Sequence, residues 1–338
     1  MAAVKQTQET STGIRIGKFE LSSPYVMAPM AGITDPPFRR LVRHFGAGLS
    51  ASEMTTADTR LWQSKKSRHR LDFDNEASPR VVQIAGSDPF ELADAARALE
   101  SMGADIVDIN MGCPAKKVCR KLAGSALMQD ESLVARILNA VVTAVEIPVT
   151  LKMRTGWNTE NRNANRLARL AEEAGIAALA IHGRTRECRY RGEAEYATIA
   201  EVAENISIPL FANGDINTVK KALEVKRLSG ADGIMIGRGA QGRPWLFRDL
   251  NAHLSQEKNP SPLPIAEVRD IILGHLDDMY RFYGEESGVR VARKHLTWYA
   301  QQFVDSAAFR YQVVRVNSTS EQLRLTRSFM DTAAWCES

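Results

Sequence analysis

The segment Gly233-Ile234-Met235-Ile236-Gly237-Arg238-Gly239 joins a short apolar run to a glycine-rich, basic loop. The same arrangement occurs one step earlier, in Pro209-Leu210-Phe211-Ala212-Asn213-Gly214-Asp215, and residues 216–228 between the two runs have a helical pattern. An apolar run that leads through a polar loop into a helix is typical of a βα unit in a parallel sheet. The two segments therefore predict consecutive βα units.

The same unit recurs toward the N-terminus, with helical patterns between short apolar runs. These runs are Tyr25–Ala28, Gly48–Glu53, Arg80–Ala85, Ile106–Asn110, Val149–Met153 and Ala177–His182. Eight βα units in about 225 residues are what a (β/α)8 barrel requires, whereas a doubly wound sheet more often has about five or six strands. The sequence therefore predicts an α/β fold with a TIM barrel over residues 14–250, and a short β-hairpin over 14–21 that closes the barrel floor.

The pattern changes after Leu250. A proline-rich linker, Asn259-Pro260-Ser261-Pro262-Leu263-Pro264, precedes three helical patterns over residues 266–283, 288–303 and 320–335. Gly284 and Gly288 stand where helices usually end. We predict a small C-terminal all-helical domain over residues 251–338, and a disordered tail over residues 1–13.

Composition excludes several classes of protein. The chain of 338 residues is 44% hydrophobic and 25% charged, which is typical of a globular protein and excludes intrinsic disorder. No apolar run approaches the ~18 residues that span a membrane, and the N-terminal residues lack the pattern of a signal peptide. The four cysteines form no C-x-x-C pair and no zinc-like cluster with histidine, which predicts neither disulfides nor a structural metal. We expect a cytoplasmic, metal-free protein that does not bind membranes.

The charge distribution is more informative than the net charge of +4. Basic residues gather without matching acids in residues 59–70, 116–121, 184–191 and 287–327. Such clusters predict a polyanionic partner, although solvated helix faces could account for any single one of them.

Polar side chains follow the apolar runs at the edge where TIM barrels place their catalytic groups. They are Met30, Glu53, Gln83, Asn110, Cys113, Lys152, His182, Asn213 and Arg238. One such residue is unremarkable, but this many predict a site. The glycines of the last two loops, with Arg238, predict a phosphate site, because backbone N–H groups can approach an anion there.

The segment Gly237–Gly242 also fits the G-x-G-x-x-G pattern of dinucleotide-binding folds. The pattern stands alone, without the strand and the acidic residue about 20 positions later that a βαβ unit would supply. The phosphate loop of a barrel is therefore the favoured interpretation.

Three residues carry candidate chemistry. Cys113 lies between Gly112 and Pro114 at a strand end; free cysteines are often buried structural residues, but here the thiol could act as a nucleophile or a general acid. Lys152 could form a Schiff base or serve as a fixed cation beside an electron-accepting ring, and only the second fits a phosphate site with a thiol acid. His182 borders several basic residues, although a lone histidine is more often structural.

Several motifs together resemble those of the tRNA-dihydrouridine synthases, flavoproteins that reduce uridine in tRNA. The motifs are Ala28-Pro29-Met30-Ala31-Gly32-Ile33-Thr34-Asp35, Asn110-Met111-Gly112-Cys113-Pro114-Ala115-Lys116-Lys117-Val118, Leu151-Lys152-Met153-Arg154-Thr155-Gly156-Trp157, His182-Gly183-Arg184-Thr185-Arg186, Tyr190 to Tyr196, Asn213-Gly214-Asp215-Ile216 and Ile236-Gly237-Arg238-Gly239. The resemblance covers residues 13–302, is closest to the bacterial B-type subfamily, and weakens beyond Asp305.

The resemblance implies non-covalent FMN, NADPH as its reductant, and tRNA as the partner of a monomeric enzyme. It assigns Cys113 as the general acid. The residues that it assigns to FMN are Pro29, Met30, Ala31, Gln83, Lys152, His182, Asn213, Gly214, Asp215, Gly237 and Arg238. The residues that we expect to meet the uridine or the tRNA are Asn110, Lys116, Lys117, Arg154, Arg184, Arg186, Arg290, Arg293 and Lys294.

The implied reaction is hydride transfer from reduced FMN to C6 of uracil, with a proton from Cys113 to C5. A stacked uridine must be extruded from folded tRNA before it can react. Another FMN barrel that reduces a free pyrimidine or a small enone would share these parts but not the basic clusters or the helical domain. An RNA-binding protein without catalysis would be expected to lack Cys113 or the phosphate loop, and both are present.

Overall fold

Eight parallel strands form the main sheet, in the order β3-β10-β9-β8-β7-β6-β5-β4. Their bounds are β3 (Tyr25–Met27), β4 (Thr55–Thr56), β5 (Val81–Ala85), β6 (Ile106–Met111), β7 (Val149–Arg154), β8 (Ala178–His182), β9 (Leu210–Asn213) and β10 (Gly233–Ile236). Strands β5 to β10 are made of buried residues along nearly their whole length, as expected where a parallel sheet is covered on its outer face and packed inside. The computed structural model describes residues 12–119, 122–255 and 260–336.

The sheet closes on itself through residues 48–53. Met27 in β3 forms a parallel bridge with Ser50, and Ala51 forms one with Val81 in β5. The N–H of Ser52 donates to the carbonyl of Val81 at 2.9 Å, and β3 pairs with β10 on its other side. The TIM barrel predicted from the sequence is therefore confirmed.

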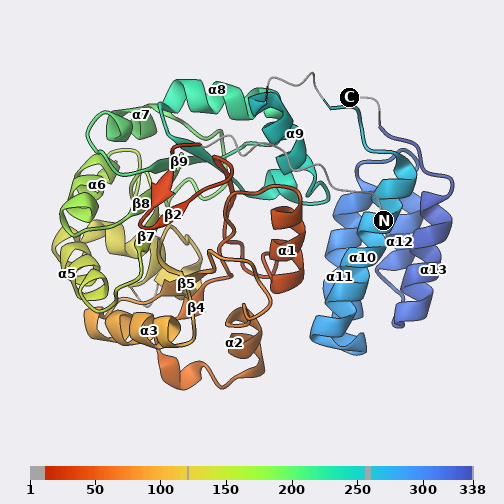
Figure 1. Cartoon of the computed structure of the whole chain (residues 1–338), viewed down its shortest axis with the longest axis horizontal. Helices are drawn as coiled ribbons and strands as arrows, with labels where there is room; N and C mark the ends of the chain where they lie inside the picture. The colour runs from red at the N-terminus through yellow and green to blue at the C-terminus, as the bar shows by residue number, and fades with distance from the viewer. Residues whose placement is uncertain (1–11, 120–121, 256–259, 337–338) are drawn as a thin grey trace. The chain divides into compact units, whose positions relative to one another are not determined.

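Helices surround the strands, as Figure 1 shows for α3, α5, α6, α7 and α8. The helical elements of this unit are α1 (Pro36–His44), η1 (Thr59–Leu61), α2 (Lys65–Arg70), α3 (Pro89–Ser101), α4 (Lys116–Cys119), η2 (Gly124–Gln129), α5 (Glu131–Val142), α6 (Ala164–Glu173), α7 (Ala197–Ala203) and α8 (Val219–Ser229). Helix α3 illustrates why they form: Asp88 accepts the N–H groups of Phe90 and Glu91, and Pro89 occupies the first turn. Its buried face repeats at helical spacing, from Leu92 to Leu99.

The predicted hairpin is present and packs into the barrel. Strands β1 (Arg15–Ile16) and β2 (Phe19–Glu20) pair antiparallel. Ile14, Ile16 and Leu21 are buried in one cluster with residues of the barrel interior such as Val26 and Phe211. The hairpin thus covers apolar side chains that the strands would otherwise leave open to water.

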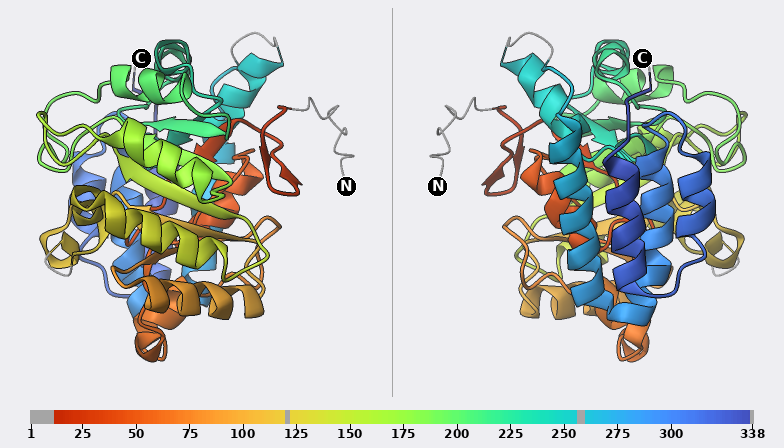
Figure 2. Two further views of the ribbon diagram at one scale, coloured as in Figure 1. Left: turned by 90° about the vertical axis from the view of Figure 1, so that its left-hand side faces the viewer. Right: turned by 90° about the vertical axis from the view of Figure 1, so that its right-hand side faces the viewer.

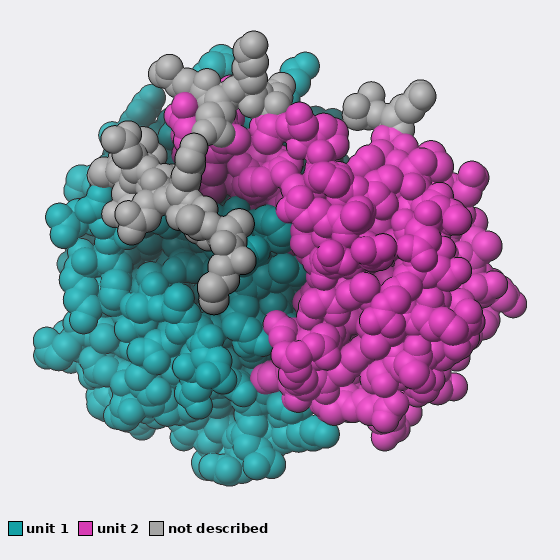
Figure 3. Space-filling model, turned by 45° about the vertical axis from the view of Figure 1, so that its right-hand side comes forward, with its two compact units in different colours: residues 1–237 teal, residues 238–338 magenta. Residues whose placement is uncertain are grey.

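The second unit is helical. The chain divides into residues 1–237 and 238–338, which Figure 3 shows in two colours. The second unit contains η3 (Arg238–Ala240), α9 (Leu246–Leu254), α10 (Ile265–Tyr283), α11 (Glu285–Ala300), α12 (Ala307–Val313) and α13 (Thr319–Met330). In it, α10 packs against α11 and α13, as the blue helices of Figure 2 show. This division assigns η3 and α9 to the helical unit, whereas the sequence analysis begins that domain at residue 251.

Two details of the helical unit differ from the sequence analysis. Helix α12 lies where no helix was predicted, and Gly288 is inside α11 instead of at a helix end. A Cβ at Gly288 would lie 3.0 Å from the Tyr280 ring, so this glycine permits close packing of α11 on α10. Gly284, with φ +77°, does end α10 as predicted.

The tail predicted over residues 1–13 falls almost entirely outside the described residues. Among the described residues, no helix is long and apolar enough to cross a membrane.

Candidate active site

The register of the barrel strands gathers the predicted site residues at one edge. Asn110 in β6 pairs with Lys152 in β7, and Arg154 in β7 pairs with His182 in β8. His182 in turn pairs with Asn213 in β9. Because parallel strands end at the same edge, these side chains from four distant segments become neighbours.

A chain of hydrogen bonds holds the loop that carries Cys113. The Nδ2 of Asn110 donates to Oε1 of Gln83 at 2.8 Å. The Oδ1 of Asn110 accepts the N–H groups of Gly112 at 3.2 Å and Cys113 at 3.0 Å. Asn110, predicted to meet the uridine, therefore also fixes the backbone of the candidate acid.

The carbonyl of Cys113 is fixed as firmly as its N–H. It accepts the N–H of Ser125 at 3.1 Å and the Ser125 hydroxyl at 2.9 Å. Gly124, with φ +62°, makes this approach possible, because a Cβ there would lie 2.8 Å from the Cys113 carbonyl oxygen. The loop therefore presents Cys113 on a backbone held from both sides.

The Cys113 side chain is half-buried, and Cys119, Cys188 and Cys336 are also free thiols. Burial raises the pKa of the Cys113 thiol. A hydrogen bond with the backbone of Ala115 and the positive charges of Arg154 and Lys152 only partly offset this rise. A thiol with a raised pKa carries its proton at neutral pH, which suits a general acid better than a nucleophile.

Lys152 supplies a buried positive charge. Burial lowers the pKa of Lys152 to about 8, with Arg154 adding to the effect and Asp108 opposing it. Its Nζ donates to Oδ1 of Asn213 at 3.2 Å, and Nδ2 of Asn213 donates to the carbonyl of Met235 at 2.8 Å. With that pKa, Lys152 remains mostly protonated at pH 7, as a fixed cation would.

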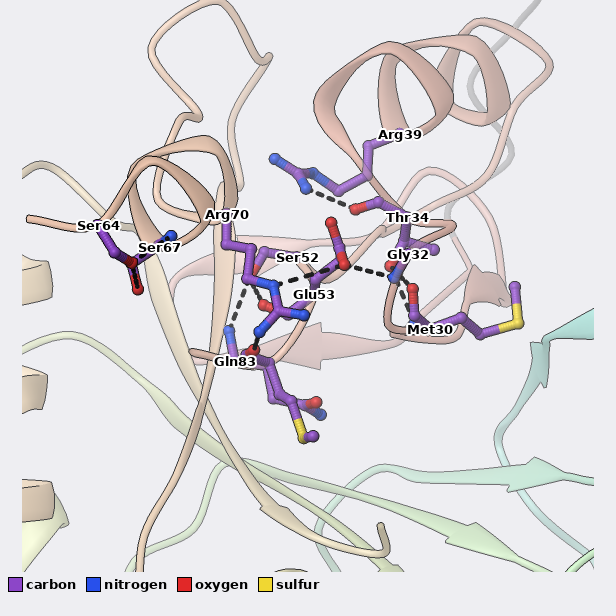
Figure 4. Close-up of polar contacts among 11 residues, drawn as sticks. Met30, Gly32, Thr34, Arg39, Ser52, Glu53, Ser64, Ser67, Arg70 and Gln83 are labelled. Atoms are coloured by element: carbon purple, nitrogen blue, oxygen red, sulfur yellow. Dashed lines mark hydrogen bonds and ion pairs between the residues drawn. The ribbon is translucent and has the colours of Figure 1, made fainter. Parts of the chain in front are cut away.

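The loop after β3 is a tight turn around Met30. The N–H of Met30 donates to Oγ1 of Thr34 at 2.9 Å, and Gly32 has φ +77° (Figure 4). The buried guanidinium of Arg39 donates to the Thr34 carbonyl at 2.7 Å. The turn places Pro29, Met30 and Ala31 at the barrel edge directly after their strand.

Glu53, in the segment just before β4, holds this turn. Its Oε1 accepts the N–H of Gly32, and Nε of Arg70 in α2 lies 3.5 Å from the same carboxylate (Figure 4). From the sequence, Glu53 is predicted only as one polar residue among many at the strand ends. Its position directly after an apolar run is what marks Glu53 as a candidate site residue in the sequence.

The loops after β8 and β9 are joined by an ion pair. Arg184 is 3% exposed and donates from Nη1 and Nη2 to the two carboxylate oxygens of Asp215 at 2.8 and 2.6 Å. The N–H of Ala194 donates to the same carboxylate at 2.8 Å, and the Tyr196 hydroxyl donates to the carbonyl of Gly214 at 2.8 Å. The side chains predicted to meet tRNA and FMN at these two positions thus bind each other.

Arg154 is also buried among backbone carbonyls. Its Nε donates to the carbonyl of Gly112 at 2.7 Å, and its Nη1 donates to the carbonyls of Thr185 and Arg189, each at 2.9 Å. Arg154 therefore ties the cysteine loop to the loop after β8. Its guanidinium also lies over the Tyr190 ring, 5.5 Å from the centroid.

Arg186 and His182 each lie near an aromatic ring. The guanidinium of half-buried Arg186 lies 4.4 Å from the centroid of the Trp157 ring. The ring of His182 lies 6.1 Å from that of Tyr190, and its Nε2 is 3.5 Å from Nη1 of Arg184. His182 thus contacts Tyr190 and Arg184 of the loop after β8, and it also lies at the barrel edge.

The remaining predicted residues fall in different places. Gly237 directly follows β10 and has room beside it, because a Cβ there would meet no atom closer than Sδ of Met30 at 3.6 Å. Arg238 begins η3 and belongs to the second unit. The same unit contains Arg290, Arg293 and Lys294, which lie in α11. Lys116 and Lys117 start α4, and their side chains lie outside what the structure describes.

Asp108 and Thr150 lie beneath the predicted site and are not among the site residues predicted from the sequence. Asp108 is 7% exposed inside β6, and Thr150 is its register neighbour in β7. An acidic residue within an apolar strand pattern is the feature by which Asp108 could have been recognised in the sequence. Across the described residues, no group of three His, Cys, Asp or Glu side chains could hold a metal ion.

Comparisons with known proteins give a consistent result. The model of a family described as "Dihydrouridine synthase (Dus)" matches residues 26–334. A "tRNA-dihydrouridine synthase B" of Pseudomonas aeruginosa is 54% identical over 316 residues, which cover 94% of this chain and 95% of the relative. A protein of the same name from Xanthomonas axonopodis pv. citri is 54% identical over 94% of this chain and 96% of its own length. One from Salmonella typhimurium is 51% identical over 95% and 100%.

Among solved structures, a nitroalkane oxidase from Streptomyces ansochromogenes aligns with a TM-score of 0.39 and 20% identity, over 64% of this chain and 65% of that one.

Proposed function

The chain belongs to the dihydrouridine synthase family, and from this premise we propose that it reduces uridines in tRNA to 5,6-dihydrouridine, with non-covalent FMN as cofactor and NADPH as reductant. One structural observation carries the proposal beyond family membership. Cys113 is held as a protonated thiol on a rigid loop, one strand away from the buried cation Lys152.

The residues at the barrel edge fit FMN. Lys152 offers a buried positive charge, which suits the polar edge of a flavin ring that becomes anionic on reduction. The space beside Gly237, next to Met30, leaves room for a group that approaches the backbone. In this assignment Pro29, Met30 and Ala31 hold the ring, Gln83 and Lys152 contact its polar edge, and His182, Asn213, Gly214, Asp215, Gly237 and Arg238 bind the ribityl chain and phosphate.

When bound, reduced FMN supplies the hydride that adds to C6 of uracil. The chain supplies the proton and the geometry. Cys113 holds its proton on Sγ for delivery to C5, and burial keeps the thiol protonated until charge develops there. Asn110 and Ser125 hold the backbone of Cys113 in place, so that the thiol need not be ordered during the reaction.

The basic residues divide into two groups in this proposal. Arg154 and Arg184 are buried and hold the loops around the site. Lys116, Lys117, Arg186, Arg290 and Lys294 are the proposed contacts to tRNA, whose phosphates attract positive charge without regard to sequence. Arg293, which the sequence also assigned to tRNA, instead donates to the carbonyl of Val316 and to Asn317. The enzyme would act as a monomer in the cytoplasm, where tRNA is available.

Mass spectrometric mapping of dihydrouridine tests the function directly. Transfer RNA from cells that lack the gene should lose dihydrouridine at specific positions, and the wild-type gene should restore it. The purified protein should be yellow and release FMN on denaturation. It should reduce uridine in tRNA but leave free uracil unchanged. Reduction of free uracil with no effect on tRNA would point instead to a small-molecule reductase, and a colourless protein that does not take up FMN would exclude the cofactor.

A further inference from the structure

Asp108 lies at the inner end of a chain of hydrogen bonds that runs through Gln83 and Asn110 to the backbone of Cys113. Its Oδ2 accepts Nε2 of Gln83 at 2.6 Å, and its Oδ1 accepts the hydroxyl of Thr150 at 2.7 Å. The strand register explains this contact, because Gln83 and Thr150 are its direct neighbours in β5 and β7. None of the roles assigned above uses this carboxylate, although it is buried at the centre of the barrel.

The direction of the chain is fixed at both ends. At one end, the N–H groups of Gly112 and Cys113 can only donate, so Oδ1 of Asn110 must face them. The Nδ2 of Asn110 then donates to Oε1 of Gln83, which leaves Nε2 of Gln83 to donate onward. At the other end, only an acceptor can complete the chain, and an ionised carboxylate accepts through both oxygens.

The charge of Asp108 has a compensating partner nearby. Burial raises the pKa of Asp108, while the hydrogen bonds from Thr150 and Gln83 and the positive charge of Lys152 oppose that rise. Lys152 lies one layer nearer the barrel edge, beside Asn110. A reversed chain would turn the NH2 group of Asn110 toward two backbone N–H groups, where donors meet donors and no hydrogen bond can form.

We propose that Asp108 is a positioning residue for the reaction: its Oδ2, as the acceptor for Nε2 of Gln83, sets the direction of the Gln83–Asn110 amide chain and thereby holds the backbone that presents Cys113. This role rests on the proposed function only for its catalytic consequence. The ordering of the cysteine loop is a property of the chain itself, and it can be measured without substrate.

Amide hydrogen exchange at Gly112 and Cys113 tests the proposal. In Asp108→Asn the new amide can turn its NH2 group as well as its oxygen toward Gln83, so position 108 no longer excludes the reversed chain, and only the N–H groups of Gly112 and Cys113 still disfavour it. Exchange at these two positions should become several-fold faster, while exchange in α5 and α6 stays as in the wild type. Thr150→Val is the matched control, since it removes the other hydrogen bond to Asp108 but leaves a carboxylate facing Gln83, and it should leave exchange at the two positions unchanged.

A swapped pair of substitutions separates this role from a merely structural one. In the double variant Asp108→Asn with Gln83→Glu, the carboxylate moves to position 83, where it can accept Nδ2 of Asn110 and also the new amide at 108. The direction toward Cys113 is then restored, and exchange at Gly112 and Cys113 should return to the wild-type rate. If Asp108→Asn fails to fold, the swapped variant alone decides: wild-type protection supports the proposal and lost protection overturns it.

The catalytic consequence is read from steady-state kinetics on tRNA. Asp108→Asn should lower kcat about tenfold or more, because a small misplacement of a catalytic group has an effect of this size. The KM for tRNA should stay within twofold of wild type. Unchanged exchange, or changed exchange with an unchanged kcat, would overturn the proposal. A wild-type protein that leaves tRNA unmodified would instead refute the proposed function, and the exchange results would still stand.

Discussion

Arg184 and Asp215 form a two-pronged ion pair between the loops that follow β8 and β9, with Nη1–Oδ1 and Nη2–Oδ2 distances of 2.8 and 2.6 Å. Asp215 has φ +48°, and Gly214 before it has φ +132°. The pair therefore stabilises a backbone conformation that is unfavourable by itself. Arg184 therefore holds the conformation of the loop after β9, which is expected to bind the FMN phosphate.

Arg184→Ala should destabilise the fold by about 2 kcal/mol, because it removes the charge-assisted hydrogen bonds to the partly exposed Asp215 carboxylate. Urea unfolding of the apo-protein measures this loss. Arg166→Ala is the control, since the exposed pair of Arg166 with Glu131, at 2.7 Å, should contribute less than about 1 kcal/mol. Equal stability of the two variants would contradict this account. A reduced salt dependence of tRNA binding in Arg184→Ala, with stability intact, would return Arg184 to RNA contact.

Gly237 and Gly214 should respond differently to alanine. A Cβ at Gly237 meets only ordinary contacts at 3.6 and 3.7 Å, so Gly237→Ala should fold with an unchanged Tm. If FMN approaches the backbone there, the Kd for FMN should rise at least tenfold, which flavin fluorescence titration measures. Gly214→Ala should instead lower the Tm, because a Cβ there would lie 2.6 Å from Cβ of Ala194 at φ +132°. Unaltered FMN affinity in Gly237→Ala would remove Gly237 from the cofactor site.

The sequence predicted the barrel and its edge because both follow from local patterns. A strand end is visible as the last apolar residue before a polar loop, and this is how Gln83, Lys152 and Asn213 were found. Burial of charge is not visible in this way: Arg184 and Arg154 stand in basic segments, and only the folded loops show that carbonyls and a carboxylate surround them. Asp108 was missed for the same reason, since its partners come from two other strands.

Lys152→Met should stabilise the apo-protein at neutral pH. The pKa of Lys152 is about 8 in the folded protein and 10.5 ordinarily. Between these pH values the unfolded chain binds a proton that the folded chain has lost, so the unfolding free energy rises with pH in this window. Below pH 8 the folded protein carries a penalty of about 3 kcal/mol for the buried charge. The wild-type and Lys152→Met stabilities should therefore converge from pH 8 to 10.5.

Thermal unfolding of both proteins across that pH range provides the measurement. The difference between them cancels the contributions of groups that do not interact with Lys152. A difference that does not change with pH would show that Lys152 is not a strained cation in the apo-protein.

Cys113→Ala should retain FMN and still oxidise NADPH, yet lose tRNA reduction about 10²–10⁴-fold, the usual contribution of a general acid. Stopped-flow reoxidation of the reduced enzyme by tRNA separates the two half-reactions. Cys119→Ala is the control: its Sγ lies 3.6 Å from the Cys113 carbonyl, which Ser125 already satisfies, so the rate should be nearly wild type. A Cys113→Ala rate within threefold of wild type would refute the assignment.

The basic face of α11 divides into two kinds of residue, and they should behave differently toward tRNA. Arg290 is exposed and pairs only with the neighbouring Glu286 on its own helix, at 2.8 Å, among the contacts described for it. Arg293 instead donates from Nη2 to the carbonyl of Val316 and to Oδ1 of Asn317, each at 2.8 Å. Arg293 thus ties α11 to the turn before α13, and its loss should lower the stability of the helical unit.

Arg290→Ala combined with Lys294→Ala should therefore weaken tRNA binding without lowering the Tm. Each lost phosphate contact removes about 0.7–0.9 from the slope of log K against log salt, so titrations at several salt concentrations count the contacts directly. NADPH oxidation should be unaffected, because the barrel is unchanged. Arg293→Ala should show the opposite pattern, with a lower Tm and an unchanged salt slope once the protein is folded. A salt slope equal to wild type in the double variant would make Arg290 and Lys294 a solvated face and place tRNA recognition on the barrel loops around Lys116 and Arg186.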